Sequence, residues 1–515
     1  MRIGIDVGGT NTDAVLVEGM EVLASHKTPT TADVGSGIIS ALENIFRKGS
    51  SRPDQISAVM IGTTHFTNAV VERRRLLKSA AIRIALPATQ ALPPMIDWPS
   101  DLREAIGNHV YLVHGGYEFD GREISALDDK EIREVAADLK RKNIRSAALT
   151  SVFAPVNGKM EERAAEILRE EIPGIYVSLS SEIGRIGLLE RENATIMNAC
   201  LQELAITVVR SFRDALNRLE ITAPFYISQN DGTLMSSVYA EKYPILTFAS
   251  GPTNSMRGAA FLSGAQEGVV VDIGGTTSDV GALAHGFPRE ASAEVEIADV
   301  RTNFRMPDLL SFGLGGGSII RQANSHMTIG PDSVGYELTE KALIFGGDTL
   351  TTTDIAVAAG QLDLGDRRKV ARLSPELIKS ALAQIHHMVE ASIDRMKTSA
   401  EPIPVILVGG GSVLISKPIA GASEIRKPEH YAVANAIGAA IAQVGGEVDR
   451  VFMLEGSSRD EALASAKREA ISKAVDAGAL ADTVKVVDVE EVPLTYLPSN
   501  SIRVRIKAVG DLAMS

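Results

Sequence analysis

The eight residues DVGGTNTD (6–13) come near the start of this 515-residue chain, and DIGGTTSD (272–279) repeats them near its middle. Each copy follows an apolar run, RIGI in the first and GVVV in the second, which is typical of a buried strand. A strand that ends in aspartate and passes through Gly-Gly-Thr into another strand predicts a tight hairpin. The repeat therefore predicts two similar α/β units in tandem.

The two glycine hairpins offer groups that bind phosphate and a metal ion. Glycines let the chain adopt left-handed dihedrals, and they let an anion approach the backbone because no Cβ stands in the way. Successive amides and threonine hydroxyls can then donate hydrogen bonds to phosphate oxygens, and Asp6 or Asp272 can hold Mg²⁺ directly or through its waters. Two such hairpins in corresponding places predict a clamp around one polyphosphate, with the metal between the two carboxylates.

Two further glycine turns could complete a nucleotide site. VILVGGGS (405–412) is a strand that runs into three glycines and suits close contact with a nucleoside. GLGGGS (313–318) is either another turn of this kind or only a tight loop. The pattern GxxxxGK[ST] does not occur in the sequence, so an ATP site here is not expected to be a P-loop.

The order of elements predicts an α/β fold with mixed sheets. The first unit is expected to contain strands over 2–7, 13–18, 21–27, 56–64 and 79–86 and helices over 32–49 and 66–75. An α/β segment is expected to be inserted at about 90–180, and a helix is expected over 429–444 in the second unit. The predicted domains are 1–190 with this insertion, 191–450, and a small α+β appendage over 451–515.

Composition excludes several classes of function. The net charge of −13 argues against a surface that neutralises many phosphates, so nucleic acid is not an expected partner. The single cysteine, Cys200, excludes an intrachain disulfide and is expected to be a small apolar residue. No stretch approaches 18 apolar residues and no leader pattern is present, so we expect no membrane partner and a cytoplasmic protein.

Together the two DxGGT hairpins and the later strand-GGG turn resemble the actin, sugar-kinase and chaperone-ATPase superfamily, whose two units are ribonuclease-H-like. Within it the chain is identified as a member of the hydantoinase/oxoprolinase family, with the A-type subunit as the best match over about residues 1–445. The matching segments are IGIDVGGTNTDAVL (3–16), IGTTHFTNAVVERR (61–74), SSEIGRIGLLERENATIMNACL (180–201), SQNDGTLM (228–235), FASGPTNSMRGAAFL (248–262), VDIGGTTSDVG (271–281), GLGGGSI (313–319) and IGPDSVG (329–335).

The sequence departs from the family pattern in three places. Asn11 stands where the family usually has Phe, and YELTEKALIFGGD (336–348) replaces a usual Pro-Gly-Pro-Ala-Cys segment. The family's A subunits also tend to be longer at the C-terminal end. Of the properties that the resemblance implies, the identity of the substrate is therefore the one that carries over least from the family to this chain.

The resemblance implies ATP-dependent opening of a cyclic amide, such as a hydantoin, 5-oxoproline or another lactam. Phosphorylation of the amide oxygen would make it a leaving group, in a step that depends on positioning and charge neutralisation. The expected cofactors are ATP and Mg²⁺, with Asp6 and Asp272 as metal carriers. The groups expected to bind the nucleotide are Gly8, Gly9, Thr10, Asn11, Gly274, Gly275, Thr276, Thr277, Gly315, Gly316, Gly409, Gly410 and Gly411.

Other polar residues are candidates for catalysis and substrate binding. Asp13 and Asp279 could orient an attacking group or only stabilise their turns. In GTTHFTN (62–68), Thr63, Thr64 and Asn68 offer neutral donors to a substrate, and His65 could be a base or a structural residue. SGPTNS (250–255) is expected to be another glycine turn near the nucleotide.

Several alternatives stay open. GGTNT also resembles the phosphate loop of certain sugar kinases, and A-like chains occur in ATP-driven ketone carboxylases. A nucleotide-dependent regulatory ATPase is a third possibility. Because family members commonly act with a B-type subunit, we expect such a partner polypeptide and an oligomeric assembly.

Overall fold

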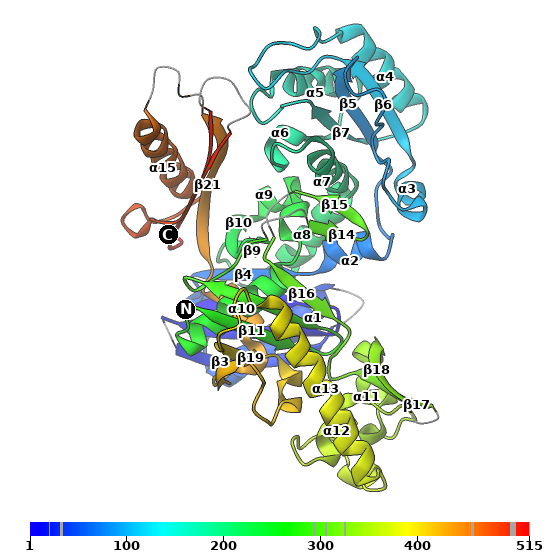
Figure 1. Ribbon diagram of the computed structural model, residues 1–515, viewed down its shortest axis with the longest axis vertical. Helices are drawn as coiled ribbons and strands as arrows, with labels where there is room; N and C mark the ends of the chain where they lie inside the picture. Colours follow the sequence, from blue (N-terminus) through cyan, green and yellow to red (C-terminus); the bar gives the residue numbers. More distant parts are fainter. Residues whose placement is uncertain are drawn as a thin grey trace.

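In the computed structural model, residues 1–19, 21–30, 34–291, 295–303, 306–323, 326–452, 454, 458–494 and 501–513 are described. Two mixed sheets lie together at the centre of the molecule (Figure 1). An α/β segment lies at one end of the long axis and a helical segment, α11 to α13, at the other (Figure 1). The predicted α/β class with mixed sheets is confirmed.

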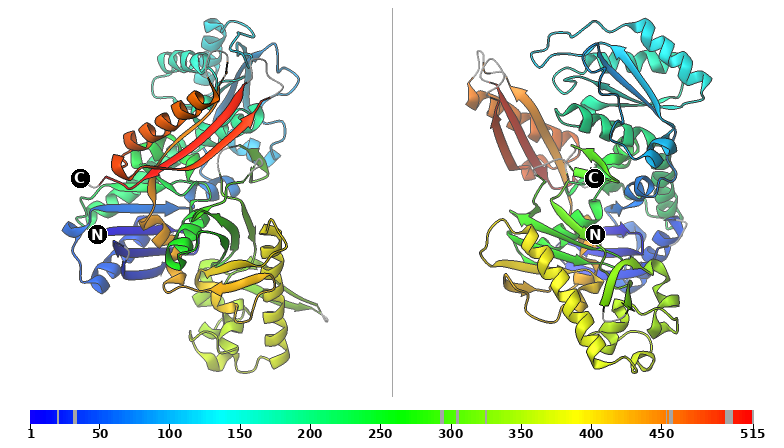
Figure 2. Two further views of the ribbon diagram at one scale, coloured as in Figure 1. Left: turned by 60° about the vertical axis from the view of Figure 1, so that its left-hand side comes forward. Right: turned by 45° about the vertical axis from the view of Figure 1, so that its right-hand side comes forward.

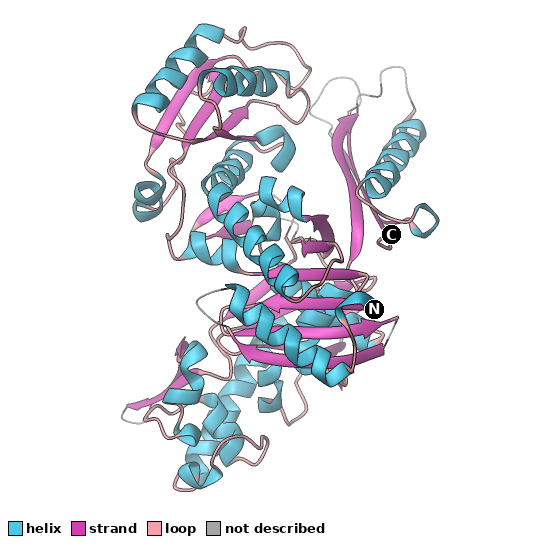
Figure 3. Ribbon diagram, turned by 180° about the vertical axis from the view of Figure 1, so that it is seen from behind, coloured by secondary structure: helices cyan, strands magenta, loops and turns pink. Residues whose placement is uncertain are grey.

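The first sheet has nine strands in the order β22-β23-β21-β10-β9-β4-β1-β2-β3. Its N-terminal part is the antiparallel meander expected from the sequence, with β4 parallel to β1. Its strands are β1 (Arg2–Val7), β2 (Asn11–Glu18), β3 (Glu21–Pro29), β4 (Ala58–Thr63), β9 (Phe225–Ser228), β10 (Thr233–Ser236), β21 (Gln443–Phe452), β22 (Lys485–Pro493) and β23 (Ile502–Gly510). Helix α1 (Val34–Gly49) packs on β2 and β3 and covers one face of this sheet (Figure 3).

The strand expected over 79–86 does form, but its predicted place in the first sheet is wrong. It is β5 (Ala80–Leu86), the second strand of a separate, wholly parallel sheet in the order β6-β5-β7-β8. That sheet has its own core beneath α4 and α5. The other elements of this part are β6 (His109–His114), β7 (Ser146–Ser151), β8 (Tyr176–Leu179), α3 (Ser100–Ile106), α4 (Asp129–Arg141), α5 (Lys159–Glu171) and α6 (Ser180–Ile183).

The helices that follow connect the parallel sheet to the rest of the chain. Three helices follow β8, namely α6, α7 (Leu188–Cys200) and α8 (Gln202–Arg218). Cys200 is buried on α7, in the apolar role expected. Short helices α2 (His65–Val71) and α9 (Ser237–Lys242) complete this part.

The second sheet repeats the strand pattern of the first. Strand β11 pairs antiparallel with β12 and parallel with β19. Its strands are β11 (Gly268–Ile273), β12 (Ser278–Ala284), β13 (Phe287–Pro288), β16 (Leu309–Phe312), β19 (Ile403–Val408) and β20 (Ala422–Arg426). Around it lie β14 (Val295–Ile297), β15 (Val300–Thr302), β17 (Ser318–Ala323), β18 (His326–Ser333), α11 (Leu338–Lys341), α12 (Thr352–Ala358) and α13 (Pro375–Met396).

Two small-residue helices, α10 (Ser250–Ser263) and α14 (Ala434–Ala440), pack between the sheets. Helix α14 lies against β1 and β2, whereas α10 contacts β4, β11 and β19. The helix expected over 429–444 is therefore much shorter than predicted. The chain leaves it to form β21, which pairs with β10 and β23.

The C-terminal unit is α+β as expected, but it is not a separate layer. Strand β21 continues the first sheet, β23 pairs with it, and β22 forms the outer edge (Figure 2). Helix α15 (Arg459–Asp476) packs its alanine face on β21 and β23. Strands from both halves of the chain share the first sheet, so this sheet extends across the predicted domain limits. Those limits stay a prediction. In the described part of the chain no helix is long and apolar enough to cross a membrane.

Candidate functional site

The two glycine hairpins face each other across one cavity of about 680 Å³. The hydroxyls of Thr10 and Thr276 lie 3.2 Å apart, so the tips of the hairpins touch. Residues from the hairpins that line the cavity are Asp6, Gly8, Gly9, Thr10, Asn11, Asp13, Asp272, Gly274, Gly275, Thr276, Thr277 and Asp279. The structure thus brings together two segments that lie about half the chain apart.

The hairpins have the same backbone hydrogen bonds and the same cross-strand pairs. The Gly8 amide donates to the Asn11 carbonyl at 3.0 Å, and the Gly274 amide donates to the Thr277 carbonyl at 2.9 Å. Asp6 pairs across the hairpin with Asp13, and Asp272 pairs with Asp279 in the same way. Each hairpin therefore places two carboxylates side by side at the cavity.

The expectation that these glycines adopt left-handed dihedrals is wrong. Gly8, Gly9, Gly274 and Gly275 are absent from the residues with positive φ. Lack of space explains these glycines instead. A Cβ on Gly8 would lie only 3.1 Å from the Asn11 carbonyl oxygen, and a Cβ on Gly274 would lie 3.1 Å from the Thr277 carbonyl oxygen. The glycines therefore keep the turns tight, and the Gly8 and Gly274 amides are used within the hairpins.

The GLGGGS turn supports the second hairpin from behind. The amides of Gly316 and Gly317 donate to the carbonyls of Gly274 and Gly275 at 3.0 and 2.7 Å. A Cβ on Gly315 would lie 2.5 Å from the Thr276 nitrogen. Gly316 lines the cavity and Gly315 does not, so this turn mainly fixes the position of the second hairpin.

The third glycine turn, at residues 409 to 411, also lines the cavity. Gly409 has φ +81°, and a Cβ there would lie 2.1 Å from the Asp272 carboxylate oxygen. Only glycine fits this position, because both the dihedral and the close approach exclude a side chain. Apolar side chains also line the cavity, namely Tyr336, Leu338, Ala356, Leu362, Leu364, Val413 and Leu414.

Asp6 and Asp13 are buried, and Asp272 and Asp279 are half-buried beside them. Burial, followed by the charges of Asp13 and Asp272, raises the pKa of Asp6 to about 7. Burial also raises the pKa of Asp272, and burial followed by the charge of Asp272 raises the pKa of Asp279 to about 6. Low exposure and mutual repulsion therefore disfavour the charged forms of these three carboxylates.

The same carboxylates are the predicted site of a magnesium ion. One oxygen of Asp6 is buried without a hydrogen-bond partner among the described residues, and magnesium prefers oxygen ligands. Both oxygens of Asp13, in contrast, lie beside the Lys27 ammonium. Among the described residues no group of three or more His, Cys, Asp or Glu side chains is placed to hold a metal ion, so Asp6 and Asp272 as magnesium carriers stay a prediction.

Two residues that the sequence analysis missed contact the first carboxylate pair. The Lys27 ammonium lies 2.7 Å from Asp13, and the Asn435 amide donates to both Asp6 and Asp13 at 2.9 Å. Asn435 is the only polar residue in AVANAIGAAIA (432–442), which is a signal that could have identified it. The side-chain partners of Asp13 thus come from β3 and α14, and Asp279 accepts a hydrogen bond from the Ser311 hydroxyl.

The predicted substrate residues are divided by the structure. Thr64 and Asn68 line the cavity, whereas Thr63 and His65 do not. His65 Nδ1 lies 2.7 Å from the Thr63 hydroxyl, and burial, with a smaller effect of Arg75, lowers the pKa of His65 to about 4. This environment favours a neutral imidazole bonded to Thr63, and a role as base stays a prediction.

Residues 250–255, expected to be a glycine turn, form the first turn of α10. Gly251, Pro252 and Ser255 line the cavity. The start of a helix presents free amides and a partial positive charge, which favour an anion. This helix start is a third group of donors facing the two hairpins.

Comparison with known proteins agrees with this site. Residues 2–172 match the model of the hydantoinase/oxoprolinase N-terminal region, and residues 191–366 match that of hydantoinase/oxoprolinase. The chain belongs to the hydantoinase/oxoprolinase family. The predicted family membership is confirmed.

Curated relatives from this family are longer than the chain. The alpha subunit of caprolactamase from Pseudomonas jessenii is 26% identical over 388 residues, which cover 70% of this chain and 54% of the relative. The gamma subunit of acetophenone carboxylase from Aromatoleum aromaticum is 26% identical over 397 residues, covering 70% and 53%. An uncharacterised protein of Methanocaldococcus jannaschii is 24% identical over 429 residues, covering 77% and 62%. The chain thus spans between half and two thirds of the length of these family members.

Two solved structures from this comparison share the fold. An ATP-dependent caprolactamase from Pseudomonas jessenii has a TM-score of 0.77 at 18% identity, and a nucleotide-free acetone carboxylase has 0.71 at 19%. Each match covers 100% of this chain and 88% of the other. The chain therefore shares the overall fold of these two proteins.

Proposed function

We propose that the chain binds ATP and Mg²⁺ between its two glycine hairpins and uses ATP to open a cyclic amide. The observation that carries the proposal is the pair of matching hairpins, each with two aspartates, facing each other across one cavity. The amides of Gly9 and Gly275, together with the hydroxyls of Thr10 and Thr276, would donate to the phosphates. The apolar wall beyond Gly410 would receive the adenine base.

The proposed reaction needs positioned charge more than covalent chemistry. The amide oxygen attacks the γ-phosphorus of ATP, and the bond to ADP breaks. Water then adds to the activated ring carbon, and the C–N bond breaks with transfer of a proton to the nitrogen, which opens the ring and leaves an acyl phosphate. A second water hydrolyses this acyl phosphate to the carboxylate and free phosphate. Asp6 and Asp272 would hold magnesium, which would supply positive charge against the phosphates, and Thr64 and Asn68 would orient the substrate.

A cyclic amide is the favoured substrate class. A hydantoin, 5-oxoproline or another lactam has the ring amide that the proposed reaction needs. Relatives of the chain include a caprolactamase subunit and proteins named 5-oxoprolinase. Because the caprolactamase and acetophenone carboxylase relatives are both named as subunits, we propose that a second polypeptide of the B type completes the enzyme. The chain would then act in the cytoplasm as part of an oligomer.

The test is a substrate panel with the purified chain, ATP and Mg²⁺, with and without the B-type polypeptide. Hydantoins, 5-oxoproline and lactams are compared by release of phosphate and of the opened product. We expect turnover of at least one cyclic amide only when both polypeptides are present. Full turnover by this chain alone would disprove the need for a partner, and no turnover of any amide with both would refute the substrate class.

One variant tests the nucleotide site independently of the choice of substrate. Asp272→Asn keeps the size of the side chain but removes a carboxylate from the centre of the cavity. We expect nucleotide hydrolysis to fall at least about tenfold, because charge stabilisation commonly supplies that much in phosphoryl transfer. Hydrolysis that is unchanged in this variant would contradict the clamp.

Carboxylation of a ketone is the second candidate. A relative at 26% identity is an acetophenone carboxylase subunit. Phosphate release that depends on bicarbonate, with no amide opened, would favour this reaction. A stable phosphorylated product would instead indicate a small-molecule kinase, and hydrolysis with no small substrate would indicate a regulatory ATPase.

A further inference from the structure

Residues 336–348, where the sequence departs from the family pattern, have no individual role in the reaction proposed above. The structure forms them into the end of a 3-10 turn (Gly335–Glu337), helix α11 and a second 3-10 turn (Leu343–Phe345). Their first residue, Tyr336, lines the cavity between the two glycine hairpins, which we call the nucleotide cavity. The departing segment therefore contributes a side chain to this cavity.

The ring of Tyr336 is open to a ligand. The residue is 65% exposed. In the part of the chain that the structure describes, no second aromatic ring and no cation lies on this ring. A flat ligand that covered the ring would remove apolar surface from water and gain stacking contacts.

Two backbone hydrogen bonds connect the segment of Tyr336 to the second hairpin. The Gly317 amide donates to the Gly275 carbonyl at 2.7 Å, and the Val334 amide donates to the Gly317 carbonyl at 3.0 Å. Tyr336 follows Val334 by two residues, which is a reach of about 7 Å along the backbone. The aromatic ring is therefore held near the turn that is proposed to bind phosphate.

The apolar side chains that accompany Tyr336 in the lining belong to connected cores. Leu338 packs with Leu362 in the core of the helical segment α11 to α13. Leu362 also packs with Leu414 in the core between the second sheet and α13. All three line the nucleotide cavity, and so does Leu364, which is 39% exposed. Tyr336 thus lies with a group of apolar side chains that can surround a flat ring.

Charged and apolar lining residues come from different elements. The charged side chains are on strands β1, β2, β3, β11 and β12, and are Asp6, Asp13, Lys27, Asp272 and Asp279. The apolar ones come from the segment between β18 and α13 and from the turn after β19. A single exposed tyrosine needs no explanation, but this one lies in the apolar part of a cavity whose other part is polar. That division matches a ligand with a polyphosphate and a flat base.

We propose that Tyr336 selects a nucleoside polyphosphate by stacking its ring on the base of the bound nucleotide. The inference rests on the proposed nucleotide site and adds to it the residue that recognises the nucleoside. Stacking suits this lining, because it needs a π face on the base and no hydrogen bond to the edge of the base. The contact is expected in chains that share the 336–348 segment, and not throughout the family.

The test is isothermal titration calorimetry of the nucleotide-free full chain with ADP and Mg²⁺. Tyr336→Ala removes the ring from an exposed position, so the fold should not change. We expect the Kd of ADP to rise at least about tenfold, as is typical for the loss of one stack between a base and an aromatic side chain. Tyr336→Phe keeps the ring and should bind ADP within about threefold of the wild-type chain.

A fluorescent analogue of ADP, etheno-ADP, reports the stack itself, because an aromatic ring on its base quenches the emission. Quenching of the fully bound analogue should be seen with the wild-type chain and Tyr336→Phe and be lost with Tyr336→Ala. The matched control is Tyr239→Ala on α9, because Tyr239 is 44% exposed and does not line the nucleotide cavity. This variant should leave both the Kd and the quenching unchanged.

Four results would overturn the proposal. They are an unchanged Kd in Tyr336→Ala, retained quenching in Tyr336→Ala, an equal rise of the Kd in Tyr336→Phe, and an equal rise in Tyr239→Ala. In each case the wild-type chain still binds ADP, so the proposed function would stand. Absence of ADP binding to the wild-type chain would instead refute the nucleotide site itself, and this inference with it.

Discussion

Two cross-strand pairs of aspartates dominate the site at the scale of single residues. Asp6 with Asp13 and Asp272 with Asp279 are adjacent by hairpin register, so the charged forms of each pair repel each other. Lys27 and Asn435 partly offset this repulsion for the first pair. A fold that keeps like charges together at the cost of stability is expected at a functional site.

Removing the Asn435 amide tests how far it positions the first carboxylate pair. We expect Asn435→Ala to lower nucleotide hydrolysis at least about tenfold, because Asp6 and Asp13 each lose a hydrogen bond to a charged group. Steady-state phosphate release measures the effect. Asn44→Ala on α1, which loses a similar amide contact to the Ser40 carbonyl, should leave hydrolysis unchanged. Equal losses in both variants would mean that the effect is structural.

His65 predicts a pH dependence of stability. Its pKa is about 4 in the folded protein and about 6.5 in the unfolded chain, so between these values the unfolded state binds more protons. The free energy of unfolding should therefore fall as the pH is lowered from 6.5 to 4, by at most about 1.4 kcal/mol per pH unit from this residue.

Urea denaturation across this pH range measures the His65 contribution. His65→Gln cannot titrate and should reduce the slope relative to the wild-type chain. An exposed histidine, His285, serves as the control, because His285→Gln should leave the slope unchanged. Identical slopes for wild type and His65→Gln would show that His65 is not buried as a neutral group.

At the scale of elements, the contact between α10 and α14 fixes how the two sheets meet. A Cβ on Gly258 would lie 1.9 Å from the Ala434 carbonyl oxygen, and one on Gly438 would lie 1.8 Å from the Asn254 carbonyl oxygen. Glycine is required here because two backbones touch. The first turn of α10 and Asn435 on α14 both face the nucleotide cavity, so this contact also sets the geometry of the site.

Gly258→Ala tests this helix contact. The added methyl meets backbone that cannot turn aside, so we expect a loss of about 3 kcal/mol in the free energy of unfolding, at the upper end for overpacking. Thermal or urea unfolding of the nucleotide-free chain measures it. Gly410→Ala is the control, since no atom lies within 4 Å of a Cβ there. A small, equal effect in both variants would refute the close approach.

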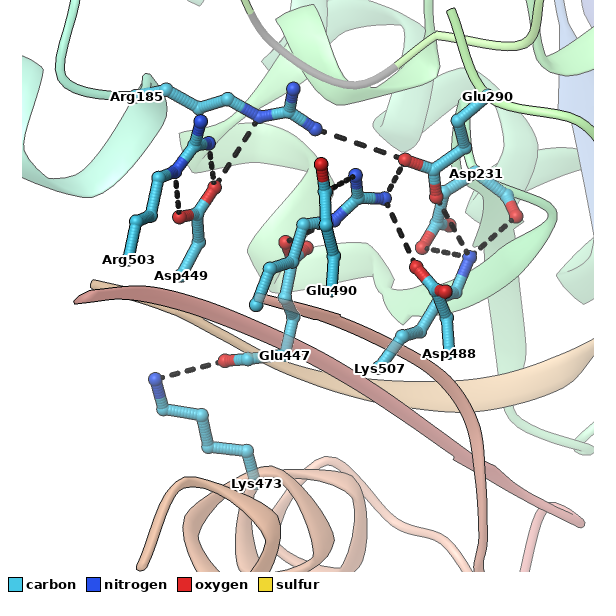
Figure 4. Close-up of polar contacts among 11 residues, drawn as sticks. Arg185, Asp231, Glu290, Glu447, Asp449, Lys473, Asp488, Glu490, Arg503 and Lys507 are labelled. Carbon is cyan, nitrogen blue, oxygen red and sulfur yellow. Dashed lines mark hydrogen bonds and ion pairs between the residues drawn. The ribbon is translucent and has the colours of Figure 1, made fainter. Parts of the chain in front are cut away.

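At the scale of the whole molecule, Glu290 ties the second sheet to the C-terminal unit. It follows β13, and it contacts Arg505 and Lys507 on β23 as well as Arg185 in the loop after α6 (Figure 4). Arg505 and Lys507 are buried, at 7% and 5% exposure. Cations in such positions depend on their acidic partners.

Glu290→Gln should destabilise the molecule through these contacts. We expect a loss of about 2 kcal/mol in the free energy of unfolding, less than the full cost of an isolated buried ion because Arg505 keeps Glu490 at 3.0 Å. Urea denaturation measures it. Glu424→Gln breaks an exposed pair with Arg426 and should change stability by less than about 0.5 kcal/mol. If Glu290→Gln lowers the free energy of unfolding no more than this control does, Glu290 does not stabilise the contact between the second sheet and the C-terminal unit.

Local pattern predicted both hairpins, because strand, glycine turn and strand are consecutive and their hydrogen bonds close within eight residues. The same pattern predicted β5 and the strands of the C-terminal unit, but not the sheet to which each belongs. Sheet pairing is a contact between distant segments, and an apolar run such as Ala80–Leu86 does not indicate which strands will pair with it. That is why β5 was assigned to the wrong sheet and the predicted helix over 429–444 ran into β21.

The sequence by itself determined the family and the two DxGGT hairpins, since these depend on residues adjacent in the chain. Only the tertiary structure decided that the hairpins face each other and that Lys27 and Asn435 meet the same aspartates. It also separated Thr64 and Asn68, which line the cavity, from Thr63 and His65, which do not. The physical reason is that a site is made of side chains that converge in space, and convergence over 400 residues depends on how helices and sheets pack.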